Sequence, residues 1–119
     1  MNNQELKAKV NSVAYTLLKS KFYVAPVDVL LGIGVLTQKD IDEWRKGKVP
    51  YLERVCKTNL SKLSLINAEI RGFAKKNNLK NSHTAYMQWE SRTKTLLRFS
   101  KSGDKNIEKN YSTHFVGAQ

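Results

Sequence analysis

The chain has 119 residues, of which 40% are hydrophobic and 26% are charged, so it is long and apolar enough to bury one core. It carries 21 Lys and Arg residues against 10 Asp and Glu residues, for a formal net charge of +11 at pH 7. A single cysteine excludes an internal disulfide framework. The polar N-terminal residues lack the features of a signal peptide, and the longest apolar stretch is too short to span a bilayer. We therefore expect one domain over residues 1–119, located in the cytoplasm and without a membrane partner.

The first predicted element is an amphipathic helix over residues 3–20. Its apolar residues recur three and four positions apart, which is the spacing of one helical face. They are Leu6, Val10, Val13, Ala14, Leu17 and Leu18. Residues 22–25 should be extended because they precede Pro26, and Pro26 itself favours the first turn of a short helix. Gly34 is placed to end that helix in a left-handed conformation.

Thr37 and Asp40 have the spacing of a capping box, which predicts a helix over residues 38–46. Gly47 should end this helix. With the short helix before it, the segment makes a helix-turn-helix-like unit over residues 26–50.

Residues 51–77 carry one sustained helical face, which predicts a single long helix or two helices stacked end to end. A break would fall at Thr58–Asn59, because Asn favours helix caps over helix interiors. Cys56 lies on the apolar face of this predicted helix, and we interpret it as a core residue. The alternative, a nucleophilic or redox thiol, needs a neighbouring base that the sequence does not show.

Residues 83–100 predict a β-hairpin, with strands over 84–89 and 94–100 on either side of a polar turn. Asp104 is placed to cap a short helix, and the tail at 113–116 is either a third strand or a segment packed on the hairpin. The predicted fold class is α+β. A helical N-terminal two-thirds precedes a small antiparallel hairpin or sheet and a short C-terminal helix.

Nine residues follow a recognisable order: a short helix ending at a glycine, then a helix that opens with Thr, buries Ile and Trp, and closes with Gly-Lys and a proline. They are Leu30, Leu31, Gly34, Thr37, Ile41, Trp44, Gly47, Lys48 and Pro50. On these residues, positions 27–54 resemble the phage-repressor-type helix-turn-helix DNA-binding domains. The resemblance implies that helix 38–46 reads DNA, with Ile41 and Trp44 buried and Asp42 exposed. The rest of the chain resembles only small bacterial proteins, which implies no function.

Three carboxylates lie on that same helix, namely Asp40, Asp42 and Glu43. Phosphates and the acceptor groups of bases would repel them. Two hypotheses therefore stay open. The unit reads DNA through the cations at its two ends, or it is a packing element of the same shape. The acidic face suits contact with a protein partner better than contact with DNA.

The positive charge is concentrated in the second half of the chain. Residues 51–119 hold 13 Lys and Arg against 5 Asp and Glu, net +8, whereas residues 1–50 hold 8 against 5, net +3. A field of this sign attracts polyanions, and nucleic acid is the commonest of these in cells. The candidate nucleic-acid contacts are Lys39, Arg45, Lys46, Lys48, Arg71, Lys75, Lys76, Arg92, Lys94, Arg98 and Lys101. Tyr86 and Trp89 interleave with the later cations and either stack on bases or belong to the core. The alternative is that the charge only maintains solubility.

The loop at 98–104 offers hydroxyls, a lysine and a glycine just before a helix start. Such a loop can cradle a phosphate through backbone N–H groups. It lacks the glycine and lysine spacing of a P-loop, and the alternative is a plain turn with an Asp104 cap.

Enzyme signatures are sparse, so we expect no catalytic residue, no metal ion and no cofactor. The principal hypothesis is a small, basic, non-enzymatic protein that binds DNA or RNA. A first alternative is a metal-independent, toxin-like endoribonuclease that uses His114, Tyr111, Arg98 and Lys101. A second alternative is a protein-interaction module or inhibitor that binds an acidic or nucleic-acid-handling partner.

Overall fold

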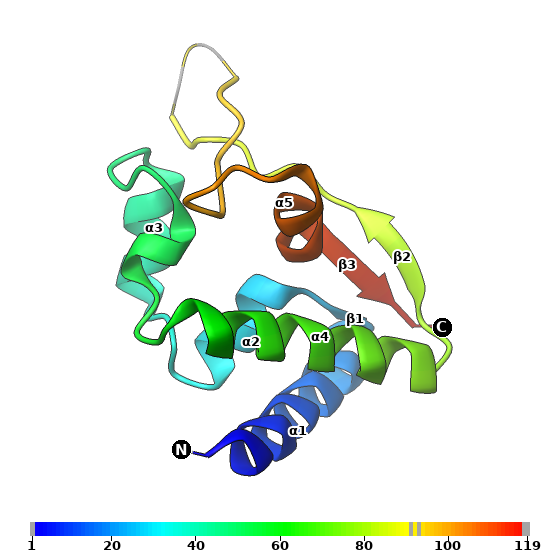
Figure 1. The fold of residues 1–119 in the computed structure, drawn as a ribbon. Coiled ribbons are helices and arrows are strands. Elements are labelled where there is room, and N and C mark those ends of the chain that lie inside the picture. The colour runs from blue at the N-terminus through cyan, green and yellow to red at the C-terminus, as the bar shows by residue number, and fades with distance from the viewer. Residues whose placement is uncertain (1, 91, 93, 118–119) are drawn as a thin grey trace.

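The computed structural model describes residues 2–90, 92 and 94–117 and shows an α+β fold (Figure 1). The fold class predicted from the sequence is confirmed. In chain order the elements are α1 (Asn3–Lys21), β1 (Tyr23–Val24), α2 (Pro26–Gly32), α3 (Gln38–Arg45), the 3₁₀ turn η1 (Leu52–Val55), α4 (Leu60–Lys76), β2 (Lys80–His83), α5 (Lys105–Ser112) and β3 (Thr113–Val116). In Figure 1, α4 crosses the middle of the molecule with α1 below it and α5 above it.

The three strands form one antiparallel sheet in the order β1-β3-β2. β3 lies in the middle, because Val116 is opposite both Tyr23 of β1 and Lys80 of β2. The C-terminal tail, left open between a strand and a packed segment, is therefore the central strand. β2 is an edge strand whose four residues are all exposed, and a polar edge of this kind discourages pairing with other chains.

The short helices begin and end where the sequence predicts. Thr37 Oγ1 accepts a hydrogen bond from the Asp40 N–H at 3.1 Å, and an Asp40 carboxylate oxygen accepts one from the Thr37 N–H at 3.0 Å. These bonds form the predicted capping box, and they hold the pKa of Asp40 below its usual value. Gly34 and Gly47 follow α2 and α3 with φ angles of +86° and +80°, a left-handed conformation that glycine adopts without strain.

α1 and α4 pack in parallel. Near their N-terminal ends, Lys62 Nζ of α4 donates a hydrogen bond to Asn3 Oδ1 of α1 at 3.1 Å. Two turns further along both helices, Asn11 Nδ2 of α1 donates one to Glu69 Oε1 of α4 at 2.8 Å. Since both contacts advance in the same direction, the C-terminal ends of the two helices lie at the same end of the molecule (Figure 1).

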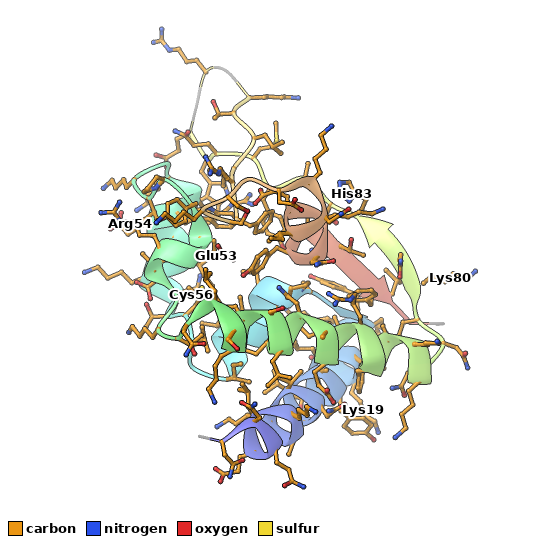
Figure 2. All side chains as sticks on the ribbon, viewed as in Figure 1. Lys19, Glu53, Arg54, Cys56, Lys80 and His83 are labelled. Atoms are coloured by element: carbon orange, nitrogen blue, oxygen red, sulfur yellow. The ribbon has the colours of Figure 1, made fainter. Side chains whose placement is uncertain are left out.

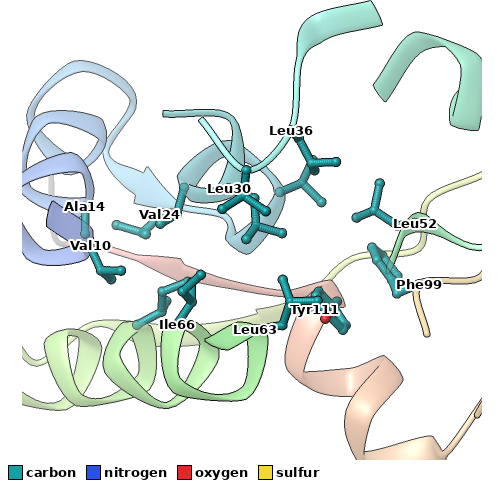
Figure 3. Packing of buried hydrophobic residues seen from close by; sticks show 14 of the residues in the cluster. Val10, Ala14, Val24, Leu30, Leu36, Leu52, Leu63, Ile66, Phe99 and Tyr111 are labelled. Carbon is teal, nitrogen blue, oxygen red and sulfur yellow. The ribbon is translucent and has the colours of Figure 1, made fainter. Parts of the chain in front are cut away.

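Trp44 of α3 is a central side chain of the core and is fully buried. Its ring lies 5.1 Å from that of Phe99 and 5.5 Å from that of Tyr86, centroid to centroid. The indole N–H donates a hydrogen bond to the Arg98 carbonyl oxygen at 2.8 Å. The same core continues through Phe99, whose ring stacks on that of Tyr111 of α5, and reaches α1 at the far side (Figure 3).

The single long helix predicted over residues 51–77 is wrong. The chain makes the 3₁₀ turn η1, breaks, and starts α4 at a cap formed by Asn59, whose side-chain oxygen accepts from the Lys62 N–H at 2.8 Å. The break is held by a distant contact, because the Lys57 N–H donates to the Val35 carbonyl oxygen at 2.9 Å. The alternative break position is thus correct, although the first piece is a single turn.

Cys56 consequently lies at the end of η1 and not on the face of a helix. It is half-buried against the core, and its Sγ donates to the Leu52 carbonyl oxygen at 3.5 Å. Burial raises the pKa of its thiol to about 12, so the thiol stays protonated and unreactive at neutral pH. Packing is the role that this placement supports.

The predicted hairpin over residues 83–100 is only partly present. One isolated β-bridge joins Met87 to Leu96. The Trp89 N–H donates to the Arg45 carbonyl oxygen at 2.7 Å, and this contact draws the segment toward α3 instead of extending the ladder. The neighbouring strand that does form, β2, contains no apolar residue, so periodicity could not reveal it.

The core position of Trp44 can be tested by replacing it with Phe. The smaller ring leaves a void and removes the N–H that pairs with the Arg98 carbonyl oxygen, so Trp44→Phe should lower the free energy of unfolding by about 2–3 kcal/mol. Urea unfolding followed by circular dichroism measures this loss. Trp89→Phe makes the same change at an exposed site and should cost less than about 1 kcal/mol. Equal losses of unfolding free energy in the two variants would contradict the assignment of Trp44 to the core.

Candidate functional site

Exposed lysines from three elements gather at the end of the molecule where α1 and α4 finish. We call this surface the lysine end. It consists of Lys19 and Lys21 of α1, Lys75 and Lys76 of α4, and Lys80 of β2. Figure 2 shows Lys19 and Lys80 on the same side of the molecule. Lysines also suit the last turn of a helix, where the dipole is negative.

The spacing along α4 explains why its lysines meet those of α1. Lys62, Glu69 and Lys76 are seven residues apart and therefore form one stripe along the helix. The first two are hydrogen-bonded to Asn3 and Asn11 of α1. The next step of the same stripe places Lys76 opposite the last turn of α1. Lys80 follows shortly after α4, at the first position of β2.

Aromatic side chains lie among these lysines. Tyr15 is 54% exposed and Phe22 is 50% exposed. Lys19 Nζ lies 5.1 Å from the centre of the Tyr15 ring, and Lys21 Nζ lies 5.9 Å from the centre of the Tyr23 ring. Phe22 ends α1 with φ of 64°, a left-handed conformation that costs a bulky residue about 1 kcal/mol. The backbone thus holds a large apolar ring at the surface.

Sequence reasoning assigned Lys75 and Lys76 to nucleic-acid contact, but it did not place Lys19 and Lys21 of α1 beside them. The signal that was available is the position of Lys19 and Lys21 at the C-terminal end of the predicted first helix. What the sequence does not contain is the relative direction of the two helices, and that direction decides whether their C-terminal lysines meet.

The predicted recognition helix, α3, buries Ile41 and Trp44 as expected. Asp42 was expected to be exposed but is half-buried, and its Oδ1 accepts a hydrogen bond from the Gln38 side chain at 2.9 Å. Three lysines of this region are exposed, namely Lys39, Lys46 and Lys48. Lys48 pairs with Glu43 at 3.6 Å, so part of this positive charge is neutralised locally.

Arg45 does not point freely into solvent. Its guanidinium lies 5.2 Å from the centre of the Tyr86 ring and 5.0 Å from the centre of the Trp89 ring. Burial lowers the pKa of Arg45, and its Nε is buried without a hydrogen-bond partner among the described residues. Arg45 therefore fastens the segment that carries both rings onto α3, and Tyr86 belongs to the core rather than to a base-stacking surface.

The remaining predicted contacts lie apart from one another. Arg92 and Lys94 are exposed near the tip of the partial hairpin. Arg98 bends back on its own loop, where its guanidinium donates to the Ser100 carbonyl oxygen at 2.8 Å and also to that of Lys101. Arg71 and Lys101 line a pocket between α4 and α5. The structure thus separates the predicted basic residues into several surfaces, and Lys75 and Lys76 are the ones that belong to the lysine end.

The loop at 98–104 is not an open phosphate cradle. Glu108 of α5 accepts from the Ser100 N–H at 2.6 Å, and Glu53 of η1 accepts from the Lys101 N–H at 3.0 Å. Asp104 accepts from two N–H groups at the start of α5. Because carboxylates of the protein already occupy these donors, the alternative of a turn with an Asp104 cap is the correct one.

The four residues named for ribonuclease chemistry do not converge. Tyr111 and Lys101 line one pocket, whereas His114 and Arg98 lie outside its lining. His114 Nε2 is hydrogen-bonded to the Tyr86 hydroxyl at 2.9 Å, and its ring stacks on Tyr23. The Tyr111 hydroxyl donates to Glu53 Oε2 at 2.7 Å, and burial together with Glu53 raises the pKa of Tyr111.

None of the described helices is both long and apolar enough to cross a membrane. Within the same described ranges, no three His, Cys, Asp or Glu side chains are grouped so that they could hold a metal ion. No protein-family model, curated protein or solved structure matches the chain.

The setting of His114 predicts how stability depends on pH. Burial lowers the pKa of His114, so the folded protein takes up a proton at lower pH than the unfolded chain does. Neutral His114 therefore makes its full contribution to the free energy of unfolding at pH values above about 6.5, the pKa of His114 in the unfolded chain. This contribution is lost as the pH falls from that value through the lower pKa of the folded protein. Urea unfolding measured from about pH 8 down to about pH 5 should show this fall, and His114→Gln should reduce it.

The exposed His83 supplies the matched control, because His83→Gln should retain the part of the fall that His114 produces. A His114→Gln variant with the full pH dependence of the parent would contradict the assignment.

Proposed function

We propose that the protein binds single-stranded nucleic acid, DNA or RNA, through the lysine end and without catalysing a reaction on it. The observation that carries this proposal is the parallel packing of α1 and α4, which gathers five exposed lysines from three elements beside exposed aromatic rings. Lysines bind the phosphates of a strand, and aromatic rings stack on its bases.

The net charge of the lysine end is large enough to attract a polyanion. Among the residues that the structure describes, Asp28 is the one carboxylate that pairs with a lysine of this surface, at 3.4 Å from Lys21 Nζ. The C-terminal dipoles of α1 and α4 each act as about half a negative charge. The five positive charges are thus reduced by one for Asp28 and by about one for the two dipoles. The remaining net charge of about +3 supports contacts to several neighbouring phosphates.

The exposed rings favour a single strand over a duplex. Bases in a duplex are stacked on one another, so they offer no free face to Tyr15 or Phe22. An unpaired strand can place its bases on these rings while its phosphates follow the lysines. The rings distinguish this surface from a set of lysines that only keeps the protein soluble.

The proposal predicts that removing charge from the lysine end weakens binding more than the same change elsewhere. Anisotropy of a labelled single strand should show affinity falling roughly tenfold or more between about 50 and 200 mM salt. A triple variant, Lys75→Gln, Lys76→Gln and Lys80→Gln, should lose at least about tenfold in affinity and show a shallower salt dependence. The matched control is Lys39→Gln, Lys46→Gln and Lys48→Gln, which should lose less than about threefold.

Absence of binding by the parent protein at low salt would refute the proposed function. Equal losses in both triple variants would show that only the total charge matters. A loss of affinity confined to the control variant would place the binding interface on the helix-turn-helix-like unit instead.

Phe22 provides a separate test of the aromatic contacts at the lysine end. Glycine relieves the left-handed strain at this position while removing apolar contacts of a half-exposed ring, so Phe22→Gly should change the free energy of unfolding by less than about 1 kcal/mol. The lost stacking surface should weaken single-strand binding by about threefold or more with an unchanged salt slope. If Phe22→Gly leaves single-strand binding unchanged, the stacking role of Phe22 is wrong. The lysine contacts are tested separately by the two triple variants.

A further inference from the structure

A pocket of about 590 Å³ opens between α4 and α5. One wall is a stripe of α4 whose members recur at helical spacing: Leu60, Ser64, Asn67 and Arg71. The opposite wall comes from α5, and the floor and rim come from Glu53 of η1 and from the loop that carries Lys101. Figure 2 shows Glu53 above α4, between α3 and α5. The volume lies in the range that holds small ligands.

Asn67 is an unusual residue for the wall of this pocket. It is 6% exposed, and its Oδ1 is buried without a hydrogen-bond partner among the described residues. Tyr111 lines the same pocket, and its hydroxyl donates to Glu53 Oε2 at 2.7 Å. A buried carbonyl oxygen without a donor lowers the free energy of unfolding. A ligand that carries an N–H group would satisfy it.

Two cations stand at the same pocket on different elements. Arg71 follows Asn67 by one turn of α4, and Lys101 belongs to the loop before α5. Neither side chain forms an ion pair with any residue that the structure describes. Both oxygens of the Glu53 carboxylate accept hydrogen bonds, Oε2 from Tyr111 and Oε1 from the Lys101 N–H. Two cations outnumber this one carboxylate in the lining, so the net charge at the pocket is positive and suits an anionic group.

Apolar side chains on both walls complete the set of contacts. Leu60 of α4 is 62% exposed and Ile107 of α5 is 37% exposed, and both line the pocket. A flat ring system placed between them would cover apolar surface that water now contacts. The pocket thus presents one acceptor, two cations and two apolar contacts to a single bound molecule.

We propose that this pocket binds a free nucleoside monophosphate. An N–H group of the base would donate to Asn67 Oδ1, the base would lie between Leu60 and Ile107, and the phosphate would contact Arg71 and Lys101. The site is separate from the lysine end, so it does not depend on the proposed binding of nucleic-acid strands.

The test is a titration of the full chain, observed by two-dimensional amide NMR, with the monophosphates of adenosine, guanosine, cytidine and uridine. At least one should give saturable shifts in the Asn67 side-chain amide and in the backbone of α5. Arg71→Gln and Lys101→Gln should each weaken that nucleotide at least about fivefold and leave the unphosphorylated nucleoside unchanged. Lys109→Gln removes the same charge from α5 outside this pocket and should have no effect.

Asn67→Leu separates a ligand-binding role from a structural one. It removes the unsatisfied oxygen, so the free protein should unfold at a higher temperature while nucleotide binding is lost. If this variant fails to fold, the Arg71 and Lys101 variants still decide the question. Absence of saturable shifts with all four nucleotides at millimolar concentration would overturn the proposal. Shifts confined to the lysine end, and lost in the Lys75, Lys76 and Lys80 triple variant, would also overturn it.

Discussion

The parallel packing of α1 against α4 is the constraint on which most of the structure depends. Two neighbouring helices that run in the same direction cannot be joined by a short turn, so the chain between them must travel back along the molecule. Residues 22–59 make this return, and they build β1, α2, α3 and η1 on the way. The same packing brings the lysine-bearing helix ends together. Because α1 covers only one flank of α4, the other flank is available to form a pocket with α5.

Features set by local chemistry could be predicted from the sequence, and features set by distant contacts could not. The capping box at Thr37 and Asp40 needs only four consecutive residues, and it is present as predicted. The break after η1 depends on a hydrogen bond from Lys57 to Val35, which the apolar periodicity of residues 51–77 cannot contain. β2 forms because β3 supplies its partner, and no alternation of its own marks it. At the lysine end, residue types were visible in the sequence, but the direction of one helix relative to another was not.

The acidic residues are placed so that few of them oppose the lysines. Asp40 and Asp104 cap helices, Glu108 and Glu53 accept from the backbone of the loop at 98–104, and Glu69 accepts from α1. Each of these carboxylates thus has a structural partner at its own place in the fold. The carboxylates stabilise turns and helix ends, whereas most of the Lys and Arg side chains stay at the surface, where their positive charge attracts anions from solution.

The central position of β3 has a consequence for how the protein is made. The strand that joins β1 and β2 consists of residues 113–116, which leave the ribosome after β1, β2 and the described helices. During synthesis, β1 and β2 therefore have no partner and the sheet cannot exist, whereas the helices can already form from local contacts. Closing the sheet joins β1 at residues 23–24 to β3 at residues 113–116, and a closure over this length of chain costs more conformational entropy than the local contacts within the helices do. A chain shortened before residue 113 would keep its helices and lose both strand interfaces at once.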